Sequence, residues 1–389
     1  MANIQKIEQI QDEMTQWRRD LHAHPEIAFE ETRTADFVAR KLAEFGLEVH
    51  RGLAKTGVVG TLTSGDGPSI GLRADMDALP IAEQTGVAHR STNAGKMHAC
   101  GHDGHTAMLL GAAKYLAATK DFKGTVRFIF QPAEELEGGG RVMVEEGLFD
   151  KFPVDSVYGM HNMPDMPVGT MSVRGGAGMA SAASFEIKVI GKGGHAAAPH
   201  EGIDPIVAAA AIVGALQTIA SRSVNPTEGI VVSITQFHAG ENALNAIPDH
   251  AILRGTARSF AADAETSVPA MIRRVAEGTA AAHGVRIEFS YLHRYPVLIN
   301  AEGPSDIAFA VGEEVVGAGK MDGIYPRIMA SEDFAFMLNA RPGAFVRLGS
   351  GFEGRESPML HSPQFDFNDK ALPIGASFWA RLVETVLAK

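Results

Sequence analysis

Between residues 69 and 162, the sequence alternates short apolar segments with segments of helical periodicity. The apolar segments 69–77, 124–132 and 156–162 predict strands, and segments 106–118 and 138–149 predict the helices between them. Strands that are short, apolar and separated by helices are typical of a parallel sheet covered on both faces. We therefore expect an α/β domain built on an open sheet with helices on both faces.

A different pattern interrupts this domain between residues 182 and 293. Its first strand alternates apolar and polar residues, as expected for a sheet with one solvated face. The segment then follows a βαββαβ order, with strand 183–194, helix 204–221, strands 229–240 and 250–260, helix 265–284 and strand 285–292. This order predicts an inserted ferredoxin-like α+β domain. The catalytic α/β domain would then comprise residues 1–181 and 294–389, with residues 182–293 as an inserted lid or dimerisation domain.

The composition of the chain limits the classes of partner and the cellular location that we expect. The 389 residues carry a formal net charge of −11, which argues against nucleic acid and anionic membrane surfaces as main partners. The longest apolar run, residues 205–216, is shorter than the roughly 18 residues of a membrane-spanning helix. A single cysteine and a polar N-terminal segment predict a cytoplasmic protein without disulfides.

That single cysteine lies in the densest histidine cluster of the chain, "HACGHDGH" at residues 98–105. Cys100 and His102 are two positions apart, so in an extended segment their side chains point the same way. A thiolate and an imidazole suit zinc or another borderline transition metal, and a bound cation keeps the thiol deprotonated. The alternative is a buried cysteine beside surface histidines.

Similar residue types follow the neighbouring predicted strands. Asp75 and Asp77 end one strand, Glu134 and Glu135 follow the next, and His161 ends a third. In open α/β sheets, sites form beyond the carboxyl ends of the strands. Consecutive side chains diverge, so one glutamate could bind metal while the other acts as a general base. Surface glutamates and a core histidine remain the alternatives.

Nine motifs, taken together and in order, resemble the di-metal aminoacylase and carboxypeptidase family, a family of di-zinc peptidase-like fold. The chain is similar to its branch of hippurate hydrolases, N-acyl-L-amino acid amidohydrolases and indole-acetyl-amino-acid hydrolases. The motifs are "RRDLHAHPEIAFEE", "GLRADMDALP", "HACGHDGHTAMLLGAA", "FIFQPAEE", "GMHN", "GKGGHAAAPH", "ENALNAIPD", "SEDFAF" and "LHSPQFDFND".

The resemblance implies a site with two divalent metal ions, zinc, manganese, cobalt or nickel. Its implied ligands are Cys100, His102, Glu135, His161 and His361. Cys100 would bridge the two ions, where many relatives use aspartate. Glu134 would be the general base that deprotonates the metal-activated water, and Asp77 would orient a ligand imidazole. His105 and Asp103 would only shape the turn.

For the inserted domain, the resemblance implies that His195 stabilises the oxyanion of the tetrahedral intermediate, and in relatives this histidine comes from the partner subunit. Asn245 and Arg258 would bind the amide oxygen or the substrate's α-carboxylate, although Arg258 could also be a strand-surface charge. The insertion would mediate a homodimer or a higher homo-oligomer. The motif at 191–196 also fits G-x-G-x-x-A, but Pro199 interrupts the helix that a dinucleotide site requires.

The expected function is a metal-dependent amidohydrolase that cleaves the amide of N-acyl-L-amino acids of the hippurate or N-acetyl type. Within the same family, the substrate could instead be a dipeptide or N-acetyl-diaminopimelate. From a different class, the chain could be a non-catalytic binder of metal or amino-acid conjugates. A binder has no need of the general base Glu134.

Overall fold

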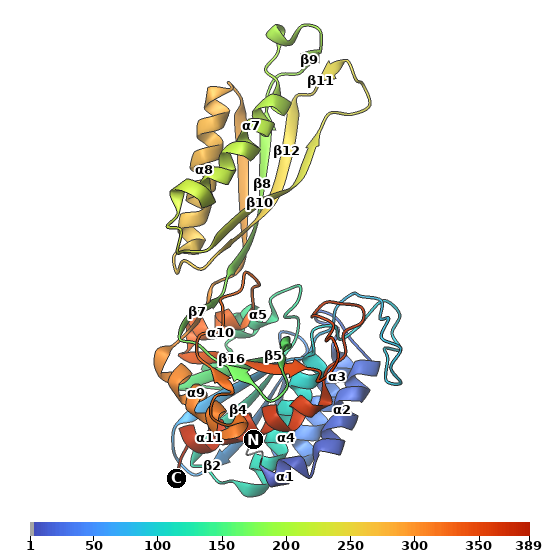
Figure 1. The fold of residues 1–389 in the computed structure, drawn as a ribbon, viewed down its shortest axis with the longest axis vertical. Coiled ribbons are helices and arrows are strands. Elements are labelled where there is room, and N and C mark those ends of the chain that lie inside the picture. Colours follow the sequence, from blue (N-terminus) through green and yellow to red (C-terminus); the bar gives the residue numbers. More distant parts are fainter. Residues whose placement is uncertain (1–3) are drawn as a thin grey trace. The chain divides into compact units, whose positions relative to one another are not determined.

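The computed structural model describes residues 4–389 and divides into two compact units (Figure 1). Unit 1 combines the chain up to Gly176 with Ile299–Pro326 and Asp333–Lys389, and unit 2 comprises Ala177–Leu298 and Arg327–Glu332. Unit 1 is therefore discontinuous in sequence. The domain limits drawn from the sequence, residues 182 and 293, stay predictions.

Unit 1 is built on an eight-stranded mixed sheet. Its order is β1-β2-β4-β3-β5-β16-β6-β15, formed by β1 (Glu48–Leu53), β2 (Gly57–Ser64), β3 (Ser69–Asp75), β4 (Gly124–Gln131), β5 (Ser156–Pro167), β6 (Met171–Ser172), β15 (Met321–Asp322) and β16 (Gly343–Gly351). The four central strands β4, β3, β5 and β16 are parallel. The antiparallel hairpin of β1 and β2 extends one edge and lies outside the strands predicted from the sequence. An antiparallel edge on a parallel core is common in such sheets.

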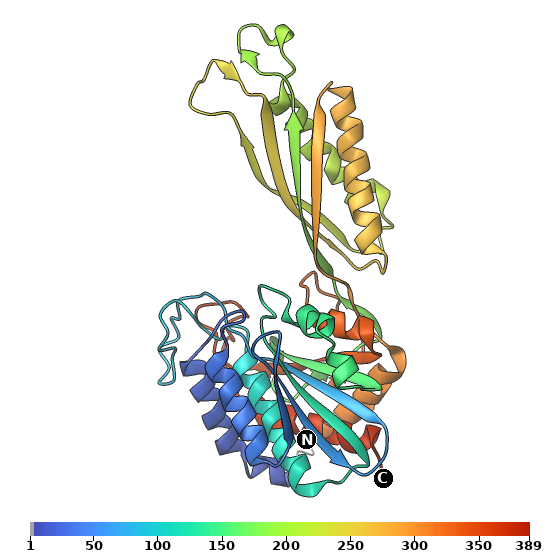
Figure 2. The ribbon, with the colours of Figure 1, turned by 180° about the vertical axis from the view of Figure 1, so that it is seen from behind.

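Helices cover both faces of this sheet, which confirms the predicted fold class (Figure 2). In β3, Leu72 and Ala74 face the hydrophobic cluster shared with α2, α3, α4, α9 and α11, whereas Arg73 lies beneath the Phe334 ring of α10. The helices of unit 1 are α1 (Gln5–Glu8), α2 (Gln11–Ala23), α3 (Thr32–Glu44), α4 (His102–Thr119), α5 (Gly139–Glu145), α6 (Leu148–Lys151), α9 (Glu302–Val316), α10 (Phe334–Ala340) and α11 (Leu372–Val386), with a short 3-10 turn at Asp369–Ala371.

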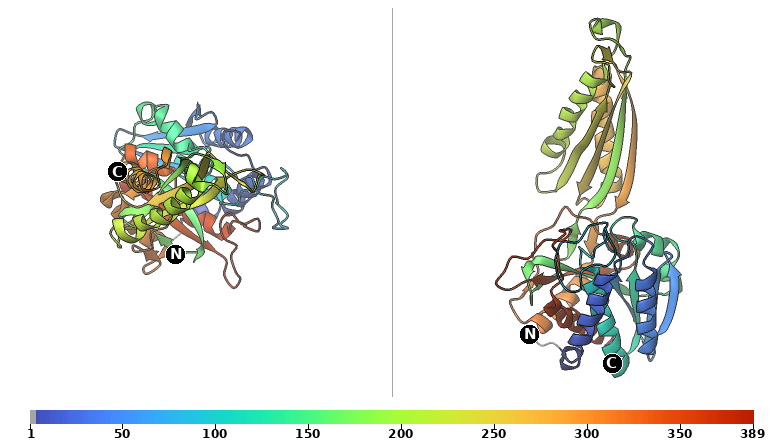
Figure 3. Two further views of the ribbon diagram at one scale, coloured as in Figure 1. Left: turned by 90° about the horizontal axis from the view of Figure 1, so that it is seen from above. Right: turned by 90° about the vertical axis from the view of Figure 1, so that its right-hand side faces the viewer.

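Unit 2 has the predicted ferredoxin-like order of elements. Its main sheet, β10-β12-β8-β13, is antiparallel throughout. Phe185, Ile187 and Val189 of β8 alternate into a core formed with α7 and α8, which lie on the same face of the sheet (Figure 3). The elements of the chain in this region are β7 (Gly176–Met179), β8 (Ser181–Ile190), β9 (Gly194–His195), α7 (Pro205–Thr218), β10 (Ile230–Ala239), β11 (Ala246–Ile247), β12 (His250–Ser259), α8 (Ala264–Ala282), β13 (Arg286–Tyr295) and β14 (Leu298–Asn300).

Among residues 4–389, one helical stretch, Pro205–Ser223, is long and apolar enough to cross a membrane by length and composition alone. Ala208, Ile212 and Leu216 of this stretch pack into the core of unit 2, which accounts for part of its apolar character. Only 28% of the most apolar 18 residues of this stretch are buried, so an apolar surface remains on α7. A single stretch of this kind is weak evidence for a membrane span.

A buried ion network joins the carboxyl ends of β3 and β4 to the start of α10. Arg73 donates hydrogen bonds to Gln131 at 2.9 Å, to Asp75 at 2.7 Å and to Asp333 at 2.9 Å. Asp333 also accepts from the backbone N–H of Gly140 at 2.7 Å. The side chains of Arg73, Asp75 and Asp333 are fully buried. One guanidinium therefore neutralises the charge of two buried carboxylates and connects the ends of β3 and β4 to the start of α10.

Replacing Arg73 with methionine should destabilise the protein strongly. Arg73→Met leaves two buried carboxylates without their cation, and such losses cost about 3–5 kcal/mol. Urea unfolding followed by circular dichroism measures the effect. Arg141→Met is the matched control, because the exposed Arg141 only pairs with Glu145 one helical turn away, and its loss should cost at most about 0.5 kcal/mol. Equal effects of the two substitutions would contradict this assignment.

Candidate active site

The five predicted metal ligands converge in unit 1 as two overlapping triads. One triad is Cys100, His102 and His161, and the other is Cys100, Glu135 and His361. Within each triad, one candidate ligand atom from each residue lies within 4.8 Å of the others. Cys100 Sγ is 3.4 Å from His161 Nε2, and His361 Nε2 is 3.3 Å from Glu135 Oε1. Because Cys100 belongs to both triads, its thiol has the position required of a ligand that contacts two ions.

A tight turn at Gly101 sets the positions of Cys100 and His102. The helix predicted at 106–118 forms, but α4 already begins at His102, so the expected start near Thr106 and the extended segment before it are wrong. Gly101 has a φ of +92°, and a Cβ at this position would lie 2.3 Å from the Asn162 side-chain oxygen. Both the left-handed backbone and the close approach therefore require glycine. The turn, and not an extended chain, brings the thiol and the imidazole together.

His161 lies within a strand and not at its end, which corrects the prediction. β5 pairs with β3 only as far as Arg73 and Gly159, and then continues alongside β16, where His161 is opposite Arg347. The strand thus runs past the end of its neighbour β3. By the same register His161 is level with Asp75, the last residue of β3, although β5 itself extends to Pro167.

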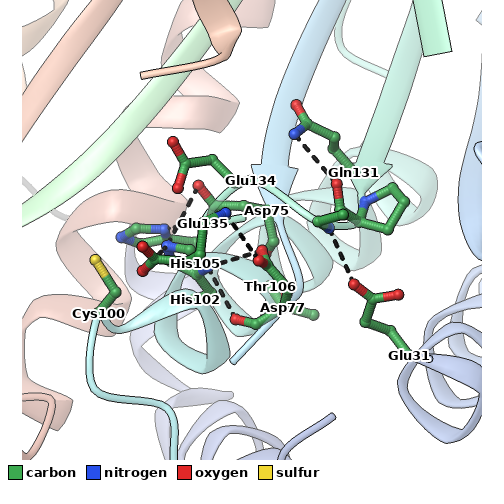
Figure 4. A network of polar contacts seen from close by, with 12 residues as sticks. Glu31, Asp75, Asp77, Cys100, His102, His105, Thr106, Gln131, Glu134 and Glu135 are labelled. Atoms are coloured by element: carbon green, nitrogen blue, oxygen red, sulfur yellow. Dashed lines mark hydrogen bonds and ion pairs between the residues drawn. The ribbon is translucent and has the colours of Figure 1, made fainter. Parts of the chain in front are cut away.

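Asp77 orients the His102 ring toward the candidate metal position (Figure 4). His102 Nδ1 is 2.9 Å from the backbone oxygen of Asp77 and 3.2 Å from its carboxylate. Both partners are acceptors, so Nδ1 is the ring nitrogen that donates a proton. His102 Nε2 is buried and has no hydrogen-bond partner among the described residues. Once a cation displaces the Nε2 proton, His102 directs a lone pair at the cluster, as a metal ligand does.

Glu134 and Glu135 follow β4 and lie beside His102 (Figure 4). Candidate oxygens of the two glutamates and a ring nitrogen of His102 lie within 4.8 Å of one another. Glu135 belongs to the triad with His361, and its backbone N–H donates to Asp77 at 3.0 Å. Glu134 is 6% exposed and belongs to neither triad that contains Cys100. It is thus a buried carboxylate next to the candidate ligands.

The loop after β16 supplies His361, the one half-exposed member of the set. Its side chain is 54% exposed, and its backbone has a φ of +64°. The backbone N–H of His361 donates to the backbone oxygen of Ala99 at 2.8 Å. This bond attaches the loop directly beside Cys100, although the two residues are far apart in sequence.

His105 lies next to the candidate ligands and contacts other buried side chains. A third group, Asp75, His102 and His105, also has candidate atoms within 4.8 Å. However, His105 Nδ1 lies 2.6 Å from Asp75 Oδ1, and its Nε2 lies 2.7 Å from the Asn162 side-chain oxygen. Both ring nitrogens are therefore engaged within the protein. His105 fixes Asp75 and Asn162 and does not present a free ligand atom.

A second buried network links α2 to both ligand-bearing loops. His22 Nδ1 lies 2.9 Å from Asp103, and Arg18 contacts Asp103 at 3.7 Å, Asp366 at 3.1 Å and Asp369 at 2.8 Å. Burial opposes the charge of His22, but its hydrogen bonds to Asp103 and Glu83 prevail and raise its pKa to about 9. No role for Arg18 or His22 was predicted from the sequence, although both lie in the motif "RRDLHAHPEIAFEE".

The electrostatics of the cluster favour a bound cation. Burial and the carboxylates of Glu135 and Glu134 raise the pKa of the Cys100 thiol well above its usual value. Burial lowers the pKa of His102, but Asp75 and Asp77 outweigh it and raise that pKa to about 10. The thiol and the imidazole thus keep their protons because the surrounding carboxylates are negatively charged. A cation can replace these protons. The sulfur, nitrogen and oxygen donors fit zinc, manganese, cobalt or nickel.

His161 is ready to bind a cation without losing a proton. Burial lowers the pKa of its imidazole to about 3. Its Nδ1 lies 2.8 Å from the backbone oxygen of Asn162, an acceptor, so the neutral ring carries its proton there. Nε2, the atom nearest to Cys100 Sγ, is then a free ligand atom.

In unit 2, His195 and Asn245 lie together and Arg258 lies apart from them. His195 pairs with Ala246 between β9 and β11, and the Asn245 backbone oxygen accepts from Ala196 at 2.9 Å. Arg258 is eight residues beyond His250 along β12, about 26 Å at the usual rise of a strand. It donates to Thr256 and Ala257 of its own strand. Unit 2 therefore brings two of its three predicted substrate contacts together.

The His195 side chain is oriented to donate a hydrogen bond. Its Nδ1 accepts from the backbone N–H of Ala197 at 3.0 Å. A neutral imidazole with an acceptor at Nδ1 carries its proton on Nε2. His195 is exposed, so a partner outside the turn can reach its side chain.

Residues 71–385 match the family described as peptidase family M20/M25/M40. The chain belongs to this family. It is 42% identical to the hippurate hydrolase of Campylobacter jejuni, covering 98% of both chains, and 43% identical to an N-acetylcysteine deacetylase of Bacillus subtilis, covering 95% of this chain and 96% of the relative. Among solved structures, a B. subtilis protein described as a dinuclear metal-binding peptidase of the M20 family aligns with a TM-score of 0.86, 39% identity and coverage of 98% and 99%.

The two triads predict distinct losses of metal. His361→Ala removes a ligand from one triad only, so the zinc content should fall from two ions to one per chain. Cys100→Ala removes a ligand common to both triads and should lower occupancy at both positions. Elemental analysis after dialysis measures both variants. His283→Ala, at the exposed end of α8, is the control and should retain both ions. Unchanged metal content in Cys100→Ala would refute the ligand assignment.

Proposed function

We propose that this M20-family chain is a metal-dependent amidohydrolase that cleaves the amide bond of N-acyl-L-amino acids, releasing a carboxylic acid and an amino acid. The observation that carries the proposal is the pair of triads sharing Cys100, with the buried carboxylate of Glu134 beside them. Relatives of 42–43% identity that are named hippurate hydrolase and N-acetylcysteine deacetylase support this substrate class. A non-catalytic binder would not need Glu134 in this position.

In the proposed site, Cys100, His102 and His161 would hold one divalent ion, and Cys100, Glu135 and His361 would hold the other. Bound ions would supply Lewis acidity, which polarises a carbonyl and acidifies water. Glu134 would take the proton of the attacking water and later deliver it to the leaving nitrogen. Asp77 would keep Nδ1 of His102 protonated and its ring oriented, through the contacts described above.

The residues of unit 2 would complete substrate recognition. The exposed Nε2–H of His195 would donate to the oxyanion that develops as water attacks. Asn245, beside it, would bind the amide oxygen, and Arg258 would hold the α-carboxylate through its planar fork. Since Arg258 lies far along β12 from the other two, we propose that one chain binds the carboxylate and that a second copy supplies His195 and Asn245.

This arrangement requires a homodimer or a higher homo-oligomer, assembled through unit 2. The largely unburied, apolar helix α7 supports this proposal, because Ile206 and Val207 are exposed at 39% and 56%. A thiolate ligand is protected from oxidation in a reducing compartment, which supports a cytoplasmic location. The smaller choices among N-benzoyl, N-acetyl and dipeptide substrates depend on pocket shape.

Replacing the proposed base should abolish catalysis without loss of metal. Glu134→Gln keeps the shape of the side chain but cannot accept a proton, so kcat on hippurate or N-acetyl-L-cysteine should fall about 100- to 10,000-fold. Its zinc content should remain at the wild-type level. Glu137→Gln, an exposed neighbour on the same turn, is the control. Full activity of Glu134→Gln would refute the mechanism, and a panel that includes dipeptides and N-acetyl-diaminopimelate would identify the substrate.

Mixing two inactive variants tests whether His195 acts from a second copy. If it does, a hybrid of Glu134→Gln and His195→Ala chains contains one site with both residues intact. Random exchange of dimer partners should then restore about a quarter of the wild-type activity. If His195 acts within its own chain, every site in the mixture carries a defect and activity stays at the level of the separate variants.

A further inference from the structure

Glu31 is a fully buried carboxylate at the start of α3, and it is far in sequence from the predicted metal ligands and from Glu134. Its Oε1 accepts hydrogen bonds from the backbone N–H groups of Phe29 at 3.1 Å and Ala133 at 2.9 Å. Its Oε2 accepts from the Thr56 hydroxyl at 2.6 Å. All three partners are donors, so the carboxylate joins three segments of unit 1. Figure 4 shows its contact with the turn that follows Gln131.

Several residues at or next to these contacts have a strained backbone conformation. Six non-glycine residues of the described chain have positive φ, and four of them adjoin or form the contacts of Glu31: Phe29, Ala54, Lys55 and Ala133. The left-handed region is sterically unfavourable for a non-glycine residue, because its Cβ comes too close to the following carbonyl oxygen. Such conformations persist where surrounding contacts hold them. Glu31 is the group that binds two of these four residues directly, at their N–H groups.

Ala133 matters most because the next two residues are Glu134 and Glu135. Its φ of +56° turns the chain sharply after β4 and Pro132. Glu31 holds the N–H of Ala133, and Asp77 holds the N–H of Glu135. The turn is also packed closely, since a Cβ on Gly139 would lie 1.8 Å from the Pro132 oxygen. Two carboxylates thus fix both ends of the segment that presents the adjacent glutamates.

We propose that Glu31 is a positioning residue for Glu134 and Glu135, acting through the left-handed backbone of Ala133. The inference rests on the proposed function of Glu134 as general base. Glu31 does not touch the reacting atoms. It holds the turn in the one conformation that places a carboxylate beside the metal ligands, and small misplacements of a catalytic group are costly in rate.

Substitutions at Glu31 test this role through the acceptor that they retain. Glu31→Ala removes every acceptor for the Ala133 N–H, so kcat should fall about 10-fold or more, with KM changed less than about 3-fold. Glu31→Gln keeps an amide oxygen for this N–H and should retain most of kcat. Glu30→Ala is the matched control, because the exposed Glu30 forms a surface ion pair with Lys96 and its loss should leave kcat unchanged.

A double-mutant cycle with Ala133→Gly separates positioning from general stability. Glycine adopts the left-handed conformation without a steric penalty. The loss of kcat caused by Glu31→Ala should therefore shrink to less than about 3-fold in the A133G background. A merely structural role would lower the melting temperature in both backgrounds and leave the fold-loss of kcat the same.

The outcomes distinguish this inference from the proposed function. Unchanged kcat in Glu31→Ala, or an equal loss in both backgrounds, would overturn the role of Glu31 while an inactive Glu134→Gln leaves the mechanism intact. An active Glu134→Gln would instead refute the assigned base. Melting curves and zinc content, measured on each variant, show that the folded, metal-loaded protein is being compared.

Discussion

Buried negative charge at the carboxyl edge of one sheet is the constraint on which the site depends. Asp75, Asp77 and Glu134 are at most 6% exposed, and Glu135 and the Cys100 thiol lie beside them. Burying carboxylates without compensation is costly, and these groups raise the pKa values of neighbouring acids and bases. Divalent cations supply the compensation that protons supply in their absence. The affinity for metal and the folding of this edge are thus parts of one electrostatic balance.

The rest of unit 1 holds each ligand-bearing segment in place with a charged group of its own. Arg73 ties the ends of β3 and β4 to α10, and Arg18 ties the Cys100 segment to the loop that carries His361. Asp77 fixes the ring of His102. Arg73 and Arg18 belong to strand β3 and helix α2, and such elements are more rigid supports than loops. A chemical site assembled from distant segments is thereby preorganised for catalysis.

Much of this arrangement could be predicted from the sequence, and the remainder depends on tertiary contacts. The fold class followed from alternating strands and helices. Asp77 and Glu135 became candidates because ligand-type residues followed strands, whereas the role of each rested on resemblance. The meeting of His361 with Glu135 rested on resemblance, since no local pattern brings such distant residues together. The roles of Gly101 and Glu31 were missed. Each depends on a left-handed turn pressed against a remote segment, and strand and helix periodicity carries no signal of such contacts.

We propose that Cys100 bridges two cations. A crystal structure of the zinc-loaded protein, with anomalous scattering recorded at the zinc edge, tests it most directly. Two zinc peaks should appear, each bonded to Cys100 Sγ at about 2.3 Å, with His102 and His161 at one ion and Glu135 and His361 at the other. A single ion, or two ions with Cys100 bonded to one or to neither, would contradict the claim.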